Sequence, residues 1–144
     1  LWFSFKRTFY RAGGREVSLD LIEHEILRTM REPRIHFAVV CASFSCPNLQ
    51  SWAYVPAKLD SQLTASAKGF LGSDKGLIID RTSQAAHFSK IFEWFGGDFQ
   101  SSGGVSAFAA KYTASQVDAD FLKAGGFETA FQEYDWSLNK QGGR

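Results

Sequence analysis

The residues that could carry out covalent chemistry are two cysteines, Cys41 and Cys46, together with three histidines. A cysteine attacks as its thiolate, and a nearby imidazole or helix N-terminus lowers the pKa of the thiol. Cys46 is the stronger candidate nucleophile, because it lies in a small, polar loop directly after a predicted buried strand, where open α/β sheets present ligand sites. Two structural alternatives remain open for Cys46: a residue packed beneath the loop, or one half of a bridge to Cys41.

His36 is the first candidate base for Cys46, and it falls inside the predicted strand. Side chains alternate between the two faces of a strand, so that His36 and Cys41 point to opposite faces and are disfavoured as a pair. A pair between His36 and Cys46 requires the loop to fold back along the strand. The alternative is a buried histidine that donates to a backbone carbonyl.

Two further residues complete the set of candidates. His87 is the reserve base, with an ordinary surface histidine as the alternative. Glu23 lies on a predicted helix, where it either orients a histidine or pairs with Arg28 or Arg34. The cysteine spacing differs from the two- to four-residue spacing of zinc ligands, and no second ligand cluster follows, so we expect no metal. We also expect no cofactor, because the chain contains neither a phosphate loop nor a dinucleotide-binding fingerprint.

The elements around these residues follow from the hydrophobic pattern. Apolar residues recur at helical spacing from Leu19 to Arg31, after Ser18 as a predicted N-cap, and Pro33 ends this helix. Residues 34–41 are nearly continuous in apolar and β-branched residues, which predicts a strand buried on both faces and central in its sheet. Cys41, at the end of that strand, is then expected to act as a small buried hydrophobe.

The rest of the chain continues the mixed pattern. Pro56 is placed to open a second helix, with Gly72 as its C-cap. Residues 127–134 fit either a helix or an edge strand, and four aromatic residues are expected in the core: Trp94, Phe95, Phe99 and Trp136. The other predicted elements are strands at 77–79 and 86–88, a helical turn at 91–95 that ends at Gly96-Gly97, and helices at 105–112 and 115–123. The result is one α/β or α+β domain over residues 1–144, in which helices flank a central strand at 34–41.

The composition and charge limit which kinds of binding partner are expected. The 144 residues are 44% hydrophobic, with sixteen basic and fifteen acidic side chains and a net charge of +1. Such a charge balance does not recruit nucleic acid, and no apolar run reaches the roughly 20 residues of a transmembrane helix. The chain begins at Leu1 rather than at a methionine, so we expect a fragment or a processed product.

Five stretches together resemble the family called domain of unknown function 547. This resemblance spans nearly the whole chain, although the aromatic, asparagine-rich N-terminal helix of the family is missing. The family is found in bacterial proteins that are often exported, which implies an extracytoplasmic location, and it is similar to papain-like and transglutaminase-like thiol folds. In papain-like enzymes the histidine follows the cysteine in sequence, as His87 follows Cys46. The five stretches are SLDLIEHEILR at 18–28, PRIHFA at 33–38, CASFSCP at 41–47, SKIFEW at 89–94 with DF at 98–99, and YDWSLN at 134–139.

Two functions follow as hypotheses. The first is a thiol-dependent hydrolase or transferase that acts on an amide or thioester. Cys46 is its nucleophile, His36 is its base, and Glu23 is a supporting residue that contacts the pair. The second is a non-catalytic domain that binds a protein or peptide, in which the loop from Cys41 to Cys46 is structural. A lowered thiol pKa separates the two, because a binding domain has no need of a thiolate.

Overall fold

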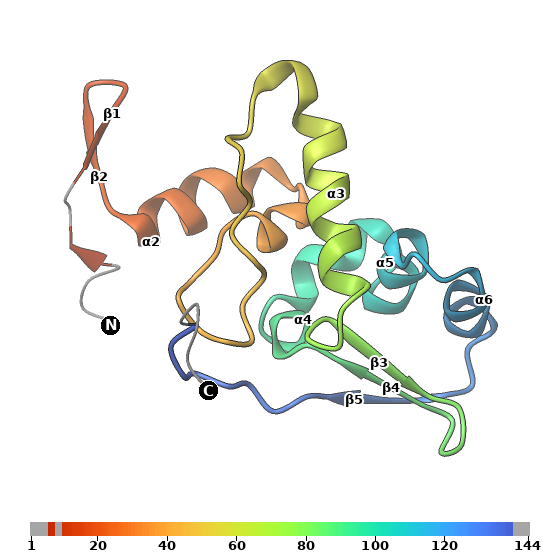
Figure 1. Ribbon diagram of the computed structural model, residues 1–144. Coiled ribbons are helices and arrows are strands. Elements are labelled where there is room, and N and C mark those ends of the chain that lie inside the picture. Colours follow the sequence, from red (N-terminus) through yellow and green to blue (C-terminus); the bar gives the residue numbers. More distant parts are fainter. Residues whose placement is uncertain (1–5, 8–9, 140–144) are drawn as a thin grey trace.

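The computed structural model describes residues 6–7 and 10–139 of the chain. The fold is mixed α/β, as the sequence predicts, with a two-stranded and a three-stranded sheet (Figure 1). The elements are β1 (Tyr10–Ala12), β2 (Arg15–Val17), α2 (Leu19–Leu21), η1 (Ile22–Leu27), η2 (Arg28–Met30), η3 (Pro33–Phe37), η4 (Pro56–Lys58), α3 (Leu59–Leu71), β3 (Leu77–Asp80), β4 (Ala85–Phe88), α4 (Lys90–Trp94), η5 (Gly96–Ser102), α5 (Val105–Tyr112), α6 (Gln116–Ala124) and β5 (Glu128–Phe131).

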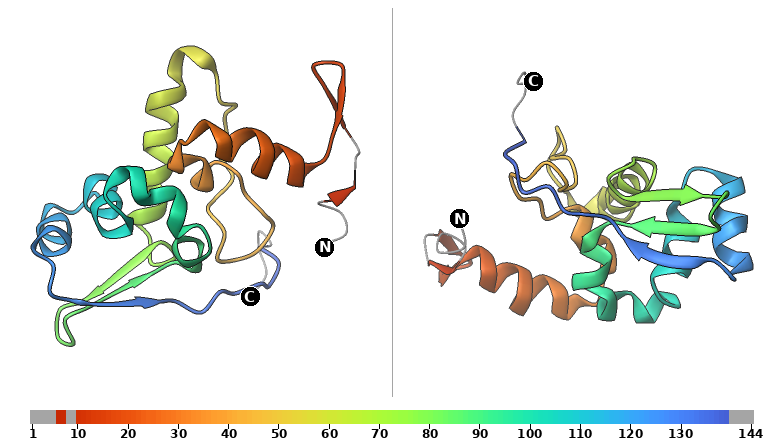
Figure 2. Two further views of the ribbon diagram at one scale, coloured as in Figure 1. Left: turned by 180° about the vertical axis from the view of Figure 1, so that it is seen from behind. Right: turned by 90° about the horizontal axis from the view of Figure 1, so that it is seen from below.

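The N-terminal hairpin and the helix after it extend away from the rest of the molecule (Figures 1 and 2). Gly13 and Gly14 connect β1 to β2 with φ angles of 59° and 78°. Two consecutive positive φ angles are the requirement of the tight hairpin turn that matches the twist of the strands. The hairpin therefore forms where the sequence places its pair of glycines.

The predicted first helix is present as a continuous run of α2, η1 and η2, in which η1 is π-helical and η2 is a 3-10 turn. The Ser18 hydroxyl accepts a hydrogen bond from the Leu21 N–H at 3.0 Å, which confirms the N-cap. Arg31 ends the helix in the left-handed conformation, ahead of Pro33. None of the helix residues is buried, and Met30 is 63% exposed, so its apolar positions do not face the core.

The predicted central strand at 34–41 is wrong. Pro33–Phe37 forms the 3-10 helix η3, and the chain continues through turns and irregular structure to Cys41. Pro33 favours the first helical turn, and the Glu32 carboxylate caps it by accepting from the Arg34 N–H at 3.1 Å. A run of β-branched residues forms a strand only beside a partner strand, whereas this segment packs on helix α3.

The three-stranded sheet lies in the second half of the chain. Strands β3 and β4 lie where the sequence predicts strands, and they pair in antiparallel register, with Leu77 opposite Phe88. Strand β5 pairs in parallel with β4, with Phe131 opposite Phe88. Of the two structures predicted for residues 127–134, the edge strand is therefore the one that forms. Figure 2 shows β5 alongside the hairpin formed by β3 and β4.

The core lies between this sheet, η3 and the helices of the second half. Helix α3 contributes Leu63, Ala67, Phe70 and Leu71, and its predicted C-cap Gly72 is confirmed. Phe99 is buried as predicted. The pair Gly96-Gly97 follows helix α4, as expected, and it also begins the 3-10 helix η5. The largest fully buried side chains of the core are Phe37, Phe88, Phe92, Phe99 and Phe108.

Two of the predicted core aromatics lie at the surface instead. Trp94 is 45% exposed and Trp136 is 67% exposed. Both indole rings contact the ring of Tyr134. At the surface an indole N–H can bond to water, so it needs no buried partner. Among the described residues, no helix is sufficiently long and apolar to span a membrane.

Candidate functional site

The loop that holds the cysteines is fixed by the C-terminal segment. Ser43 and Leu138 form an isolated antiparallel bridge. The Phe44 N–H donates to the Ser137 carbonyl at 2.8 Å, and the Asn139 N–H donates to the Ala42 carbonyl at 2.8 Å. Two segments about ninety residues apart in sequence are thereby paired, and this pairing brings Tyr134 to the cysteines.

The two thiols lie in contact with one another. The Cys41 N–H donates to the Cys46 sulfur at 2.8 Å. The Cys41 sulfur lies 3.2 Å from the Ser43 hydroxyl and 3.5 Å from the Tyr134 hydroxyl. Both cysteines are free thiols; Cys41 is half-buried, whereas Cys46 is only 4% exposed. The predicted nucleophile Cys46 is therefore the covered sulfur, and Cys41 is the accessible one.

Hydrogen bonds decide which of the two thiols ionises first. The Cys46 thiol donates to the Cys41 sulfur, and this bond, with those from Ser43 and Tyr134, holds the pKa of Cys41 well below its ordinary value despite partial burial. The same shared proton, together with burial, raises the pKa of Cys46. Burial and the hydrogen bond to Cys41 raise the pKa of the Tyr134 phenol, so it stays a donor. Of the two thiols, Cys41 is therefore the one whose pKa is lowered.

His36 pairs with the carboxylate of Asp98. Its side chain is 2% exposed, and its Nε2 donates to Asp98 Oδ2 at 2.9 Å. The ring stacks on Phe95 with centroids 4.2 Å apart. Burial lowers the pKa of His36, although the hydrogen bond to Asp98 acts in the opposite direction, so the imidazole is neutral at pH 7. The expected pair of His36 with Cys46 is not formed.

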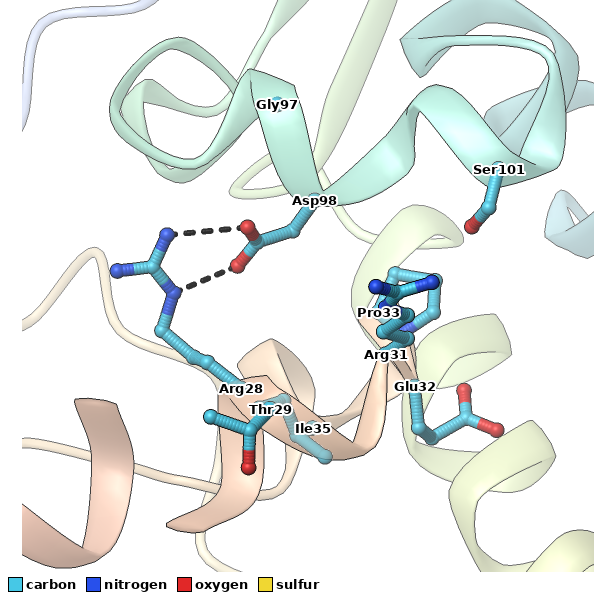
Figure 3. Close-up of a pocket in the computed structure, with 9 residues that line it drawn as sticks. All are labelled: Arg28, Thr29, Arg31, Glu32, Pro33, Ile35, Gly97, Asp98 and Ser101. Atoms are coloured by element: carbon cyan, nitrogen blue, oxygen red, sulfur yellow. Dashed lines mark hydrogen bonds and ion pairs between the residues drawn. The ribbon is translucent and has the colours of Figure 1, made fainter. Parts of the chain in front are cut away.

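Asp98 is the centre of this second cluster, and the sequence pattern alone does not single it out. Its two oxygens accept from Arg28 Nε at 2.7 Å and Arg28 Nη2 at 3.0 Å, a bidentate pair that lowers the pKa of the carboxyl (Figure 3). The position lies in one of the five stretches quoted above, which is the signal that could have identified it. Asp98 ties the first helix to η3 through Arg28 and His36.

The pair of Arg28 and Asp98 borders a pocket of about 430 Å³ (Figure 3). Arg31, Glu32 and Ser101 also line it, and neither cysteine does. The reserve base His87 lies on β4, opposite Ile78, and lines a second pocket that likewise contains no cysteine. Neither pocket therefore presents a thiol next to a histidine.

Glu23 is close enough to Cys41 for the two groups to interact electrostatically. Burial raises the pKa of its carboxyl, while the charge of Arg28 acts to lower that pKa and that of Cys41 to raise it. The expected ion pairs are not formed, because Arg28 binds Asp98 and Arg34 binds Glu32 and Asp60. Glu23 is thus a half-buried carboxyl within electrostatic range of the Cys41 sulfur.

An exposed aromatic cluster adjoins the thiol site through Tyr134. The ring of Tyr134 lies 4.8 Å from Trp94 and 4.5 Å from Trp136, measured between centroids. The two tryptophans stack on one another at 5.6 Å. Because the Tyr134 hydroxyl contacts Cys41, this cluster and the thiol site share one residue.

The comparisons with known proteins give one match. Residues 1–71 match the model of a family described as protein of unknown function, DUF547. By this stretch, the chain belongs to that family. The DUF547 match contains both cysteines, His36 and Glu23, and it ends before Asp98 and Tyr134.

No curated protein and no solved structure matches the chain significantly. Among the residues that the structure describes, no group of three or more histidine, cysteine and acidic side chains is arranged to hold a metal ion.

Proposed function

We propose that this protein is a thiol-dependent acyl transferase or hydrolase that acts on thioesters, with Cys41 as its nucleophile. The observation that carries the proposal is the environment of the half-buried Cys41 sulfur, which three polar groups surround: the Cys46 thiol and the hydroxyls of Ser43 and Tyr134. Groups that can donate a hydrogen bond to the sulfur stabilise a thiolate more than a thiol. A purely structural cysteine has no need of them.

The choice of Cys41 over Cys46 rests on access and on charge. Cys46 is 4% exposed, and its sulfur accepts the Cys41 N–H while its own proton is directed to the Cys41 sulfur. A substrate carbonyl cannot approach Cys46 without opening the loop. Cys46 acts instead as a positioning residue that keeps Cys41 ionised.

We favour thioesters over amides because, among the described residues, no hydrogen bond joins an imidazole to the Cys41 sulfur. An amide nitrogen must be protonated before it leaves, which is the task of the histidine in papain-like enzymes. His36, however, is bonded to Asp98. A thiolate leaving group needs no such proton, because its own pKa is low. A strongly ionised thiol is also a weaker nucleophile, which favours an activated acyl group.

The reaction has two steps. The Cys41 thiolate attacks the thioester carbonyl carbon, and the intermediate collapses with cleavage of the substrate C–S bond, so that an acyl-cysteine and a free thiolate result. Water or an acceptor thiol then takes the acyl group and regenerates Cys41. Ser43 and Tyr134 are the hydroxyl donors available to the developing oxyanion. Glu23 is our candidate for the base that accepts the proton of the acceptor.

The experiment compares the two thiols directly. The rate of alkylation by iodoacetamide is measured against pH for the full chain, for Cys41→Ser and for Cys46→Ala, and S-phenyl thioacetate is then used as the acyl donor. We expect fast alkylation at Cys41 that levels off with an apparent pKa below the ordinary value of about 8.5, and an acetyl group on Cys41 by mass spectrometry. Cys46→Ala should raise that apparent pKa.

Two results would overturn the proposal. One is alkylation of Cys46 ahead of Cys41 in the folded protein. The other is a Cys41 that titrates at an ordinary pKa and takes up no acetyl group while the protein stays folded. Ser43→Ala serves as a matched variant, because it removes one hydroxyl beside the sulfur and should raise the apparent pKa of Cys41 by a smaller amount than Cys46→Ala does.

The second candidate function, a domain that binds a protein or peptide, is favoured by the exposed cluster of Trp94, Tyr134 and Trp136. Exposed aromatic residues of this kind are enriched in protein interfaces. An unchanged affinity for a captured partner in Cys41→Ser, combined with a normal thiol pKa in the wild type, would favour this function over the enzyme.

A further inference from the structure

The two cysteines differ in access but share one contact, which is the arrangement of a reactive thiol beside a second thiol that can resolve it. Cys41 is half-buried, and Cys46 is 4% exposed. The Cys46 sulfur lies 2.8 Å from the backbone nitrogen of Cys41. An oxidant from solvent therefore reaches Cys41 first, and the product meets Cys46 at once.

We propose that Cys41 and Cys46 form a peroxide-sensitive modification site, in which Cys41 is oxidised to a sulfenic acid and Cys46 converts this acid into an intrachain disulfide. This proposal goes beyond acyl transfer and shares with it only the reactive sulfur of Cys41. The oxidant is a small hydroperoxide.

The chemistry balances in two steps. The Cys41 thiolate attacks the outer oxygen of the hydroperoxide, the O–O bond breaks, and an alkoxide or hydroxide leaves and takes up a proton; the sulfur is oxidised by two electrons. The Cys46 sulfur then attacks the sulfenic sulfur, the S–OH bond breaks, and water leaves with the Cys46 proton. In total, two thiols and one hydroperoxide give one disulfide, one alcohol or water, and one further water.

The loop already brings the Cys46 sulfur close to the backbone of Cys41. The bond from N to Cα adds at most about 1.5 Å, so the Cys46 sulfur lies within about 4.3 Å of the Cys41 Cα. In a disulfide the partner sulfur lies three bonds from this Cα, through the Cβ and an S–S bond of about 2.0 Å. The remaining adjustment is a rotation of the Cys41 side chain. The bridge between Ser43 and Leu138 holds the loop in place during that rotation.

The surroundings of Cys41 favour a small oxidant over a bulky disulfide substrate. The sulfur is half-buried, and neither of the two pockets described above reaches it. A hydroperoxide is small enough to approach, and the hydroxyls of Ser43 and Tyr134 stand beside the sulfur as donors to the departing oxygen. An exchange reaction with a protein disulfide needs a wider approach in line with the sulfur.

The aromatic cluster supplies a second readout of the oxidised state. In the reduced protein the Tyr134 hydroxyl lies 3.5 Å from the Cys41 sulfur, and its ring contacts Trp94 and Trp136. Formation of the disulfide takes the Cys41 thiolate away from Tyr134. We expect the emission of the two tryptophans to change together with loss of the thiols, and to recover on reduction.

The test treats the reduced full chain with one equivalent of hydrogen peroxide and follows free thiols, intact mass and tryptophan emission. The expected product has lost the mass of two hydrogen atoms, contains no free thiol, and yields a peptide that links Cys41 to Cys46. In Cys46→Ala, dimedone should label Cys41 as a sulfenic acid. In Cys41→Ser, oxidation of the remaining thiol should be at least about tenfold slower, because that thiol is buried and protonated.

Three results would overturn the proposal: overoxidation of Cys41 to sulfinic acid with Cys46 still a free thiol, disulfides only between chains, or oxidation no faster than that of a free model thiol. Tyr134→Phe is the matched variant, since it keeps the ring and removes the hydroxyl, and it should slow sulfenic acid formation several-fold. The two proposals fail separately. A disulfide without acyl transfer would leave only the redox site, and acyl transfer without a disulfide would leave only the enzyme.

Discussion

Replacement of Asp98 by alanine should destabilise the protein more than any other loss of a single surface-accessible carboxylate in the described residues. Asp98 accepts from Arg28 through both oxygens and from His36 through one of them. It joins the first helix, which buries none of its own residues, to η3 and η5. The variant Asp98→Ala therefore removes the polar link that holds this helix to the body.

The size of the effect follows from the exposure of the two partners. The His36 side chain is 2% exposed, and a hydrogen bond between such a group and a carboxylate contributes about 1.5–3 kcal/mol. The Arg28 side chain is 33% exposed, and a solvent-accessible ion pair of this kind contributes about 0–1 kcal/mol. The sum is about 1.5–4 kcal/mol of unfolding free energy.

The assay is chemical unfolding in urea, followed by far-UV circular dichroism, with thermal unfolding as a second measure. For a chain of this length, 1 kcal/mol corresponds to roughly 3–5 °C in the unfolding temperature, so Asp98→Ala should unfold about 10 °C lower. Glu93→Ala is the matched control, because Glu93 pairs with Lys90 at an exposed position on one helical turn. That control should lose less than about 0.5 kcal/mol.

One result would refute this reasoning. That result is an equal loss of unfolding free energy in Asp98→Ala and Glu93→Ala, within the roughly 0.5 kcal/mol to which such values can be compared. It would mean that the buried His36 side chain gains no stability from its hydrogen bond to Asp98. The network would be an ordinary surface ion pair, and the first helix would be held by other contacts.

Three further predictions concern acid, the core and the glycines. Burial lowers the pKa of His36 below its value in the unfolded chain. The contribution of His36 to the unfolding free energy is therefore complete above about pH 6.5 and is lost as the pH falls toward the lower pKa of the folded state. His36→Phe should weaken this acid dependence of the unfolding free energy, whereas His24→Gln should retain it. Phe37→Ala should cost about 3–5 kcal/mol in urea unfolding, because Phe37 is fully buried among other phenylalanines. Gly76→Ala should strongly lower the unfolding temperature, because a Cβ there overlaps the backbone at the end of helix α3, whereas Gly69→Ala, in open space within α3, should stabilise by about 0.5–1 kcal/mol.

Local signals in the sequence predicted the elements that are stabilised locally. The N-cap Ser18, the opening Pro56 and the C-cap Gly72 all act within one helical turn, and each prediction is confirmed. Strands β3 and β4 coincide with two short apolar runs of the sequence. The interpretation of residues 34–41 as a strand was wrong, because the presence of a partner strand is not a local property.

The candidate site shows the same division. The sequence alone identified the loop between the cysteines, and it identified Glu23 and His36 as residues of interest. It could not tell which thiol is accessible, since the burial of Cys46 and the exposure of Cys41 depend on the pairing of the loop with residues 134–139. It also could not supply Asp98 as the partner of His36, because the two lie 62 positions apart.

The amino-acid sequence by itself determined the mixed α/β class, the ends of most helices and the presence of two thiols in one short loop. These features depend on hydrophobic periodicity, capping residues and turn residues, whose effects extend over a few positions. The tertiary structure alone decided that Cys46 is buried while Cys41 stays partly accessible, and that His36 pairs with Asp98. The pKa of a thiol and the partner of an imidazole depend on burial and on donors brought in from distant segments, which only the folded chain assembles.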